Sequence, residues 1–448
     1  MKSMPIPALH RKFPADFVWG VATSSFQIEG ATAVDGRGES IWDRFCRQPG
    51  AIADASDGSI ACDHFHRMEA DLDLIADLGV NCYRFSIAWP RVQPLGSGAW
   101  NPAGLAFYER LVDGLQQRGI QAFATLNHWD LPQALQETGG WANRDTVHRF
   151  VDYARHVQAH LGDRLAGLTT HNEPWVVAVL GHEQGVFAPG IKSRKTAIQV
   201  AHHLLLSHGL AMQALRADGA KEQLGIVLNL SPATPATAMP EDIAAAQMAD
   251  ARGRRWYTDP LFKGCYPDEV LAELGADAPQ VEAGDMAAIA QPMDYLGVNY
   301  YMRSVVSASG EPWNAAARGL PVSDMDWEIY APGLTDLLCL LHHDYPALPP
   351  LYVTENGGAF KDDQIARGRV QDDDRIAYLQ THIAAVAAAM DKGVRMAGYM
   401  VWSLMDNFEW ASGYLKRFGI VHVDYASQVR TPKASAEWYR DFLRQWRG

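Results

Sequence analysis

Hydrophobic and polar residues alternate along the chain in two kinds of segment. Eight short β-rich runs are mostly apolar on both faces, which is the pattern of parallel strands covered by helices. Between these runs lie longer amphipathic stretches with apolar residues at helical spacing. The predicted strands occupy residues 16–24, 81–89, 121–129, 167–173, 225–231, 294–301, 351–357 and 398–406.

Glycines mark the ends of the predicted helices. The stretch 104–120 has apolar residues at helical spacing, and Gly119 ends that helix. The stretch 145–163 repeats the arrangement, with Asp145 as the candidate N-cap and Gly162 as the stop. Each helix is therefore expected to separate two neighbouring strands.

Eight strands with intervening helices predict a single closed barrel. No Pro/Gly/Ser linker divides the chain, so residues 1–448 are expected to form one (β/α)8 TIM barrel of the α/β class with long loops after the strands. The charged run 361–375, after the seventh strand, is predicted to be a solvated loop.

Composition narrows the functional class. The 448 residues are 48% hydrophobic and 20% charged, as in globular proteins. A net charge of −13 without a basic block argues against nucleic acid and an anionic membrane surface as partners. No apolar run reaches the roughly 18 residues of a membrane span, and the first residues lack the apolar core of a signal peptide. Scattered cysteines without a CxxC pair predict reduced thiols and a cytoplasmic location. They are Cys46, Cys62, Cys82, Cys265 and Cys339.

Polar and aromatic residues gather at the carboxyl ends of the predicted strands, where barrel enzymes place their chemistry. Singly, a buried His is usually a hydrogen-bonded structural residue and a Trp or Tyr usually packs in the core. The opposite strand ends carry no comparable set, so the convergence predicts a site. Its candidates are Gln27, Arg84, His128, Trp129, Asn172, Glu173, Asn299, Tyr301, Glu355, Trp402, Glu409 and Trp410.

Two glutamates in this set point to a reaction. Glu173 and Glu355 lie on the fourth and seventh strands, nearly opposite in the ring, and paired carboxyl groups are what glycoside hydrolysis requires. Aromatic platforms suit the apolar faces of sugars, and polar side chains suit their hydroxyls. The sequence has no lysine at a predicted strand end and no dinucleotide fingerprint, so no cofactor is expected.

Seven motifs give the chain a resemblance to a known family. They are FVWGVATSSFQIEGA, YRFSIAWPR, NHWDLP, THNEPW, LGVNYY, VTENGG and WSLMDNFEWASGYLKRFGIVHVDY. In this order, and spread over nearly the whole chain, they resemble family 1 glycoside hydrolases, and among them a β-glucosidase. The resemblance implies a retaining mechanism, with Glu173 as acid/base and Glu355 as nucleophile.

The resemblance also implies how a substrate is held. The expected substrate is a β-glucoside or cello-oligosaccharide, with galactosides and fucosides left open. Aglycone contacts are expected from Trp175 and Trp327. The glycone is expected to contact Gln27, His128, Trp129, Asn172, Tyr301, Trp402, Glu409 and Trp410.

The proposed roles set physical requirements. Glu355 must be ionised to attack, so Arg84, Tyr301 and Asn299 are expected to support it. Glu173 must hold a proton, and repulsion from Glu355 together with desolvation is expected to raise its pKa. In a retaining enzyme the two carboxyl groups lie about 5–5.5 Å apart.

Other readings of the same residues remain open. A transglycosylating β-glycosidase would keep every residue named, whereas a non-catalytic sugar-binding barrel would have lost a glutamate. A 6-phospho-β-glucosidase is disfavoured because the anionic Glu409 would repel phosphate, although Lys416 and Arg417 follow it.

Histidines outside the predicted site have simpler interpretations. His171 should face the helix layer as a packed or hydrogen-bonded residue, with a bond near Glu173 as the alternative. Several histidine clusters lack zinc-ligand spacing, so no metal site is expected. These clusters are Asp63, His64 and His66, His202 and His203, and His342 and His343.

Overall fold

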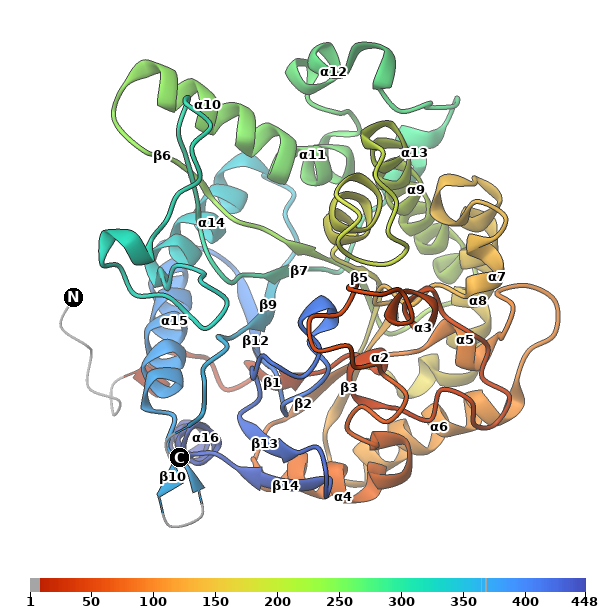
Figure 1. Cartoon of the computed structure of the whole chain (residues 1–448), viewed down its shortest axis with the longest axis vertical. Coiled ribbons are helices and arrows are strands. Elements are labelled where there is room, and N and C mark those ends of the chain that lie inside the picture. Colours follow the sequence, from red (N-terminus) through yellow and green to blue (C-terminus); the bar gives the residue numbers. More distant parts are fainter. Residues whose placement is uncertain (1–8, 364, 367–368) are drawn as a thin grey trace.

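The fold is a closed eight-stranded parallel barrel, seen here in a computed structural model that describes residues 9–363, 365–366 and 369–448. The strands form the central ring of Figure 1 and the helices lie around it. Each of the eight predicted strands is confirmed. In barrel order they are β1 Val18–Ala22, β12 Met396–Trp402, β9 Leu351–Asn356, β7 Tyr295–Asn299, β5 Gln223–Asn229, β4 Gly167–Asn172, β3 Gln121–Asn127 and β2 Cys82–Ser86.

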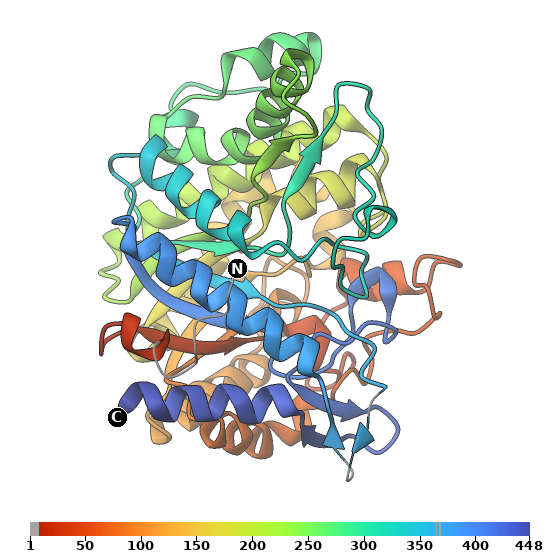
Figure 2. The same ribbon diagram turned by 90° about the vertical axis from the view of Figure 1, so that its left-hand side faces the viewer.

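Helices connect successive strands along the outside of the ring, and Figure 2 shows α15 and α16 against the barrel wall. The longer ones are α4 His64–Asp77, α6 Pro102–Gln117, α8 Asp145–Leu161, α9 Arg194–Ala217, α10 Pro240–Asp250, α14 Ala331–Asp344, α15 Asp373–Asp391 and α16 Ala434–Arg447. Shorter ones are α2 Ser25–Ile28, α3 Ile41–Cys46, α5 Trp89–Val92, α7 Gln133–Gln136, α11 Trp256–Lys263, α12 Asp268–Leu274 and α13 Asp285–Ile289. Two π-helices, Val176–Glu183 and Ala251–Arg255, and short 3-10 turns complete the connections.

The ends of α6 and α8 follow the glycine signals with one difference. Gly119 lies just beyond α6 with a left-handed φ of 66°, and Gly162 directly follows α8. Asp145 is the first residue of α8 and not its N-cap. The Asn143 side chain accepts a hydrogen bond from the Asp145 backbone N–H at 3.0 Å, so the residue two positions earlier satisfies that donor.

Aromatic rings close the interior of the barrel below its mouth. Phe123, Tyr295 and Tyr352 lie with ring centroids 5.4–5.8 Å apart. Glycines on neighbouring strands make room for them: a Cβ at Gly167 would lie 2.5 Å from the Phe123 ring, and one at Gly398 would lie 2.7 Å from Tyr352. The barrel is therefore a packed core with one open polar end.

Irregular pairing at the carboxyl ends of two strands redirects their side chains. The register of β4 with β5 shifts between Thr169 and Asn172, and the pairings of β9 with β7 and β12 shift beside Glu355. A bulge places two successive residues on one face of a strand. As a result Thr354 and Glu355 both make hydrogen bonds within the barrel mouth.

The charged run after the seventh barrel strand is only partly a solvated loop, because several of its charges are buried in ion pairs. Lys433 Nζ lies 2.5 Å from Asp362 Oδ2 and 2.7 Å from Asp406 Oδ1. Arg375 contacts Asp362 and Asp372, and these three side chains are at most 1% exposed. The prediction is wrong for these residues because each buried carboxylate has a cationic partner. The hairpin of β10 Ile365–Ala366 and β11 Arg369–Val370 continues this segment.

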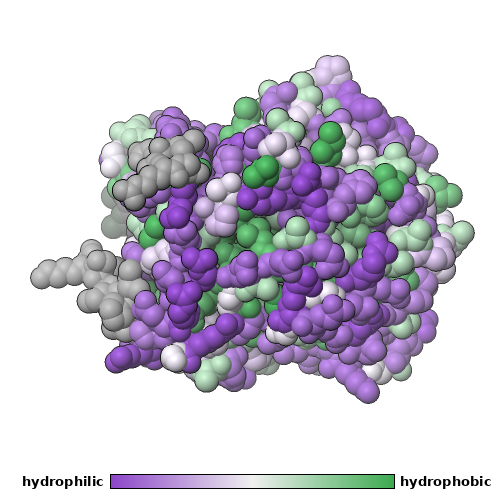
Figure 3. Space-filling model, turned by 90° about the horizontal axis from the view of Figure 1, so that it is seen from below, coloured by the Kyte–Doolittle hydropathy of each residue, from purple (hydrophilic) through white to green (hydrophobic). Residues whose placement is uncertain are grey.

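Two further small sheets lie outside the barrel. They pair β6 Ala233–Pro235 with β8 Ser304–Val306, and β13 Val421–Asp424 with β14 Val429–Pro432. The face of the molecule in Figure 3 is mostly hydrophilic. Among the described residues no helix is long and apolar enough to cross a membrane.

Candidate active site

The carboxyl ends of the strands bring the predicted residues to one mouth. Gln27 lies on α2 just after β1, Arg84 on β2, and His128 and Trp129 directly after β3. The remaining members lie at the carboxyl ends of β4, β7, β9 and β12 or after them. Most of these polar side chains are nearly inaccessible: Gln27 and Asn172 are 0% exposed, and Glu355 is 3% exposed.

Glu355 is held by two donors. Arg84 Nη1 donates to Glu355 Oε1 at 2.6 Å, and Tyr301 Oη donates to Oε2 at 2.6 Å. Burial, followed by the charge of Glu355, raises the pKa of Tyr301 well above its usual value, so the phenol keeps its proton. The guanidinium on one oxygen and the phenol on the other hold the carboxyl group in one orientation.

Glu173 has different surroundings. It follows β4 with a left-handed φ of 50°, and its backbone N–H donates to Val227 O at 2.9 Å. Burial, and then repulsion from Glu355, raises the pKa of Glu173 well above its usual value, although the hydrogen bond from Asn299 acts in the opposite direction. Glu173 is thus suited to hold a proton while Glu355 is ionised.

Asn299 supports a different carboxyl group from the one expected. Its Nδ2 donates to Glu173 Oε1 at 2.5 Å and to Asn172 Oδ1 at 3.1 Å. Its Cα is paired in register with Glu355, but its side-chain bonds go to the β4 side of the mouth. Parallel pairing places the backbones of Asn299 and Glu355 side by side. The direction of each side chain depends instead on the local bulge.

A chain of hydrogen bonds fixes which atoms donate. Arg84 Nη2 donates to Asn172 Oδ1 at 2.6 Å, so that oxygen is an acceptor and the Asn172 NH2 faces His128 Nε2 at 3.1 Å. His128 Nε2 therefore accepts, as a neutral imidazole permits. Burial, with Arg84 nearby, lowers the pKa of His128 well below its usual value, which agrees with a neutral ring.

Gln27 and Glu409 meet on the opposite side of the mouth. Gln27 Nε2 donates to Asn407 Oδ1 and Phe408 O at 2.9 Å, and to Glu409 Oε2 at 3.3 Å. Burial, and then the charge of Glu355, raises the pKa of Glu409 to about 8. These side chains can donate to and accept from vicinal hydroxyls, which is the chemistry a sugar ring presents.

Comparisons with known proteins agree with this geometry. Residues 9–447 match Glycosyl hydrolase family 1.

The chain belongs to this family.

Its relatives within the family are similar over nearly their full lengths. A "Beta-glucosidase" of Agrobacterium sp. is 47% identical over 96% of this chain and 95% of its own. A "Bifunctional beta-D-glucosidase/beta-D-fucosidase" of Bifidobacterium breve is 43% identical over 96% and 98%. The solved structure of virulence factor SghA from Agrobacterium tumefaciens, 46% identical, superposes with a TM-score of 0.95 and covers 99% of this chain and 100% of that one.

Aromatic rings line this family 1 mouth. Trp410, with a left-handed φ of 49°, lies between Trp129 at 4.5 Å and Trp42 at 4.6 Å, measured between ring centroids. Trp402 is 3% exposed and lies nearly parallel to His128 at 5.9 Å. Trp42 was absent from the predicted set because it lies on α3, away from any strand end.

The two predicted aglycone residues lie farther out on the rim. Trp327 is partly buried, and its ring centroid lies 5.4 Å from that of Tyr301, the phenol bound to Glu355. Trp175 is also partly buried and immediately precedes the π-helix Val176–Glu183. Trp175 is therefore close to Glu173 along the chain, and Trp327 is close in space to the phenol that binds Glu355.

The basic pair after Glu409 is already bound to carboxylates. Lys416 Nζ donates to the backbone oxygen of Asp324 and, at 3.1 Å, to its Oδ2. Arg417 Nη1 donates to Asp406 Oδ2 at 2.6 Å. These ion pairs neutralise the two cations that a phosphate would need.

His171 lies in the wall between β4 and the helices, as expected. Its ring nitrogens lie 3.1 Å from Asn127 Nδ2 and 2.8 Å from Ser207 Oγ, and it stacks on Phe150 at 4.4 Å. Burial lowers its pKa well below the usual value, so the ring is neutral. None of these contacts reaches Glu173.

Histidines elsewhere are paired within the fold. His64 Nδ1 lies 2.8 Å from Asp71, and His202 Nε2 lies 3.0 Å from Asp285. Across the described part of the chain, no group of three or more His, Cys, Asp or Glu side chains is arranged to hold a metal ion.

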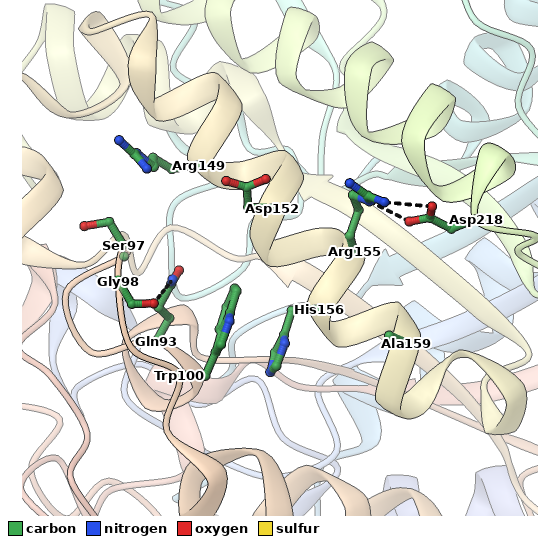
Figure 4. Close-up of a pocket in the computed structure, with 11 residues that line it drawn as sticks. Gln93, Ser97, Gly98, Trp100, Arg149, Asp152, Arg155, His156, Ala159 and Asp218 are labelled. Carbon is green, nitrogen blue, oxygen red and sulfur yellow. Dashed lines mark hydrogen bonds and ion pairs between the residues drawn. The ribbon is translucent and has the colours of Figure 1, made fainter.

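A separate pocket of about 420 Å³ lies on the outer wall, between the loop 93–100 and α8 (Figure 4). Trp100 stacks on His156 there at 3.7 Å, and Arg155 pairs with Asp218 at 2.6 Å. Its lining contains neither Glu173 nor Glu355, so it is distinct from the site at the barrel mouth.

Proposed function

We propose that this chain is a retaining β-glucosidase that removes terminal β-D-glucosyl residues from β-glucosides and cello-oligosaccharides. The observation that carries the proposal is the unequal environment of the two carboxyl groups. Glu355 has Arg84 and Tyr301 as donors, whereas burial and repulsion raise the pKa of Glu173. Relatives named as β-glucosidases, and a structure of SghA "with its substrate analog salicin", support the substrate class.

In the first step Glu355 attacks the anomeric carbon. Glu173 gives its proton to the glycosidic oxygen as the bond to the aglycone breaks, and a covalent glycosyl ester forms on Glu355. Arg84 and Tyr301 hold the attacking carboxylate in position throughout.

In the second step Glu173 reverses its role. Esterification removes the negative charge of Glu355, so the repulsion that raised the pKa of Glu173 disappears and its pKa falls. Glu173 then takes a proton from water as the water oxygen attacks the anomeric carbon and Glu355 leaves. Two displacements give net retention of configuration.

The glucosyl group would be held by the hydrogen-bonding residues Gln27, His128, Asn172 and Glu409, with Trp402 and Trp410 as aromatic surfaces. The aglycone would lie outward between Trp175 and Trp327. A phosphorylated sugar is disfavoured because Lys416 and Arg417 are paired with Asp324 and Asp406.

Proton NMR of an aryl β-glucoside during hydrolysis tests the proposal. The β-anomer of glucose should appear first and then mutarotate to the α-anomer. Initial α-glucose would contradict a retaining mechanism, and absence of turnover would contradict an enzyme.

A further inference from the structure

Thr354, beside Glu355 on β9, makes a hydrogen bond that the proposed mechanism leaves unused. Thr354 is 1% exposed, and its Oγ1 donates to Asn299 Oδ1 at 2.7 Å. The same Asn299 amide donates through Nδ2 to Glu173 Oε1 at 2.5 Å. Thr354 is therefore joined to Glu173 through one amide group.

The direction of that amide follows from groups whose donor roles are fixed. A guanidinium only donates, so Asn172 Oδ1, at 2.6 Å from Arg84 Nη2, is an acceptor. The Asn299 atom 3.1 Å from this oxygen is then the NH2, and the atom facing the Thr354 hydroxyl is the carbonyl oxygen. Arg84 on one side and Thr354 on the other thus hold the Asn299 amide in one orientation.

This orientation makes the two oxygens of Glu173 unequal. Oε1 receives an N–H donor and so is disfavoured as the site of a proton. Among the described residues no hydrogen bond reaches Oε2, and the Glu173 side chain retains a little exposure at the mouth. A proton on Oε2 would therefore be available to a bound glycoside.

We propose that Thr354 is a positioning residue for proton transfer, which holds the Asn299 amide so that Glu173 carries its catalytic proton on Oε2. This inference rests on the proposed function. In glycosylation the proton passes from Oε2 to the glycosidic oxygen while the C1–O bond breaks and the bond from C1 to Glu355 forms. In hydrolysis Oε2 takes a proton from the attacking water.

Thr354→Val removes the hydroxyl and keeps the shape of the side chain. Asn299 Oδ1 then lacks its donor, so the amide is held from one side only, by Asn172 Oδ1. The bond from Asn299 Nδ2 to Glu173 Oε1 weakens, which lets Oε1 take the proton. A proton on Oε1 points away from the leaving group. Glycosylation should therefore slow by about tenfold for substrates whose leaving group must be protonated, which is the factor expected for one buried hydrogen bond.

Two variants serve as controls. Thr354→Ser keeps the hydroxyl and should restore the wild-type behaviour. Thr169→Val makes the same change in another inward-facing threonine, whose Oγ1 lies 2.5 Å from Tyr295 Oη in the barrel core. It should leave the chemistry at the mouth unchanged.

The measurement is kcat/KM for β-glucosides whose leaving groups differ in basicity. Thr354→Val should lose about tenfold with cellobiose or an alkyl glucoside and less than about twofold with 2,4-dinitrophenyl β-glucoside, which needs no protonation. The alkaline limb of its pH profile should also move to higher pH, because the hydrogen bond from Asn299, which lowers the pKa of Glu173, is weakened. Glu355, Arg84 and Glu409, the other charged groups near Glu173, are unchanged in this variant.

Equal losses with both leaving groups, or a Thr354→Val profile that matches Thr169→Val, would overturn the inference. If wild-type hydrolysis released α-glucose first, the proposed function would fail and the inference with it. If β-glucose appeared first and only the Thr354→Val result disagreed, the inference alone would fail.

Discussion

Replacement of Tyr301 by Phe removes a single hydroxyl from the site. That hydroxyl donates to Glu355 Oε2 at 2.6 Å, while Arg84 continues to donate to Oε1 at 2.6 Å. The ring itself remains and can still pack against Trp327 and Phe418. The change therefore isolates one charge-assisted hydrogen bond to the proposed nucleophile.

The expected magnitude follows from the charge and burial of the acceptor. A hydrogen bond to a charged group contributes about 1.5–3 kcal/mol, and each ~1.4 kcal/mol is tenfold in rate. Tyr301→Phe should therefore lower kcat/KM by about ten- to 150-fold. The loss has a physical cause, since Glu355 keeps only one donor and is less firmly held in its ionised, attacking orientation.

The assay is steady-state hydrolysis of 4-nitrophenyl β-glucoside, with the thermal midpoint measured in parallel. Tyr352→Phe is the matched control, because Tyr352 lies on β9 below Glu355, and its hydroxyl contacts Gln223 at 3.3 Å, away from the mouth. A change below about threefold in Tyr301→Phe, or an equal loss in the control, would refute the assigned role.

Three further predictions concern other residues. Glu173→Gln should lower kcat/KM for cellobiose by about 10²–10⁴-fold and affect 2,4-dinitrophenyl β-glucoside far less. It should also change the alkaline limb of the pH profile, since Glu173 loses its proton as pH rises through its raised pKa; an unchanged limb would contradict the assignment. Lys433→Met leaves Asp362 and Asp406 without their shared cation and should lower the free energy of unfolding by about 3–5 kcal/mol in urea titrations. A change under ~1 kcal/mol is typical of exposed ion pairs and would contradict the claim that these pairs stabilise the protein as buried ones. His171→Leu should leave the pH–rate profile unchanged, and a shifted acidic limb would show coupling to the site.

Periodicity and motif order predicted the barrel and most of the mouth. Parallel strands buried on both faces have apolar runs of characteristic length, and the carboxyl ends of such strands must meet at one rim. Because Glu173 and Glu355 lie at the carboxyl ends of two strands of a closed ring, their convergence could be predicted without coordinates.

Side-chain direction at those ends was less predictable. Strict alternation would have sent Thr354 and Glu355 to opposite faces, but the shifted register beside Glu355 allows both to bond within the mouth. The same kind of irregularity on β4 lets Asn299 bond to Glu173. Bulges depend on the fit of neighbouring strands, which a local sequence window does not contain.

Long-range pairing explains the remaining differences. Asp362 and Asp372 read locally as solvated charges, yet they contact Lys433 and Arg375, and Lys433 lies more than 60 positions away in the chain. Trp42 likewise joins the site only because α3 packs beside Trp410. Such contacts arise when loops from different strands meet above the barrel.

Trapping of the covalent intermediate tests the central claim most directly. A 2-deoxy-2-fluoro-β-glucoside with an activated leaving group slows hydrolysis of the ester, so the labelled protein should accumulate with the mass of one fluoroglucosyl group. Mass spectrometry of its peptides should place that group on Glu355, in the VTENGG segment. A label on any other residue, or an unlabelled enzyme that still turns over ordinary glucosides, would contradict the account.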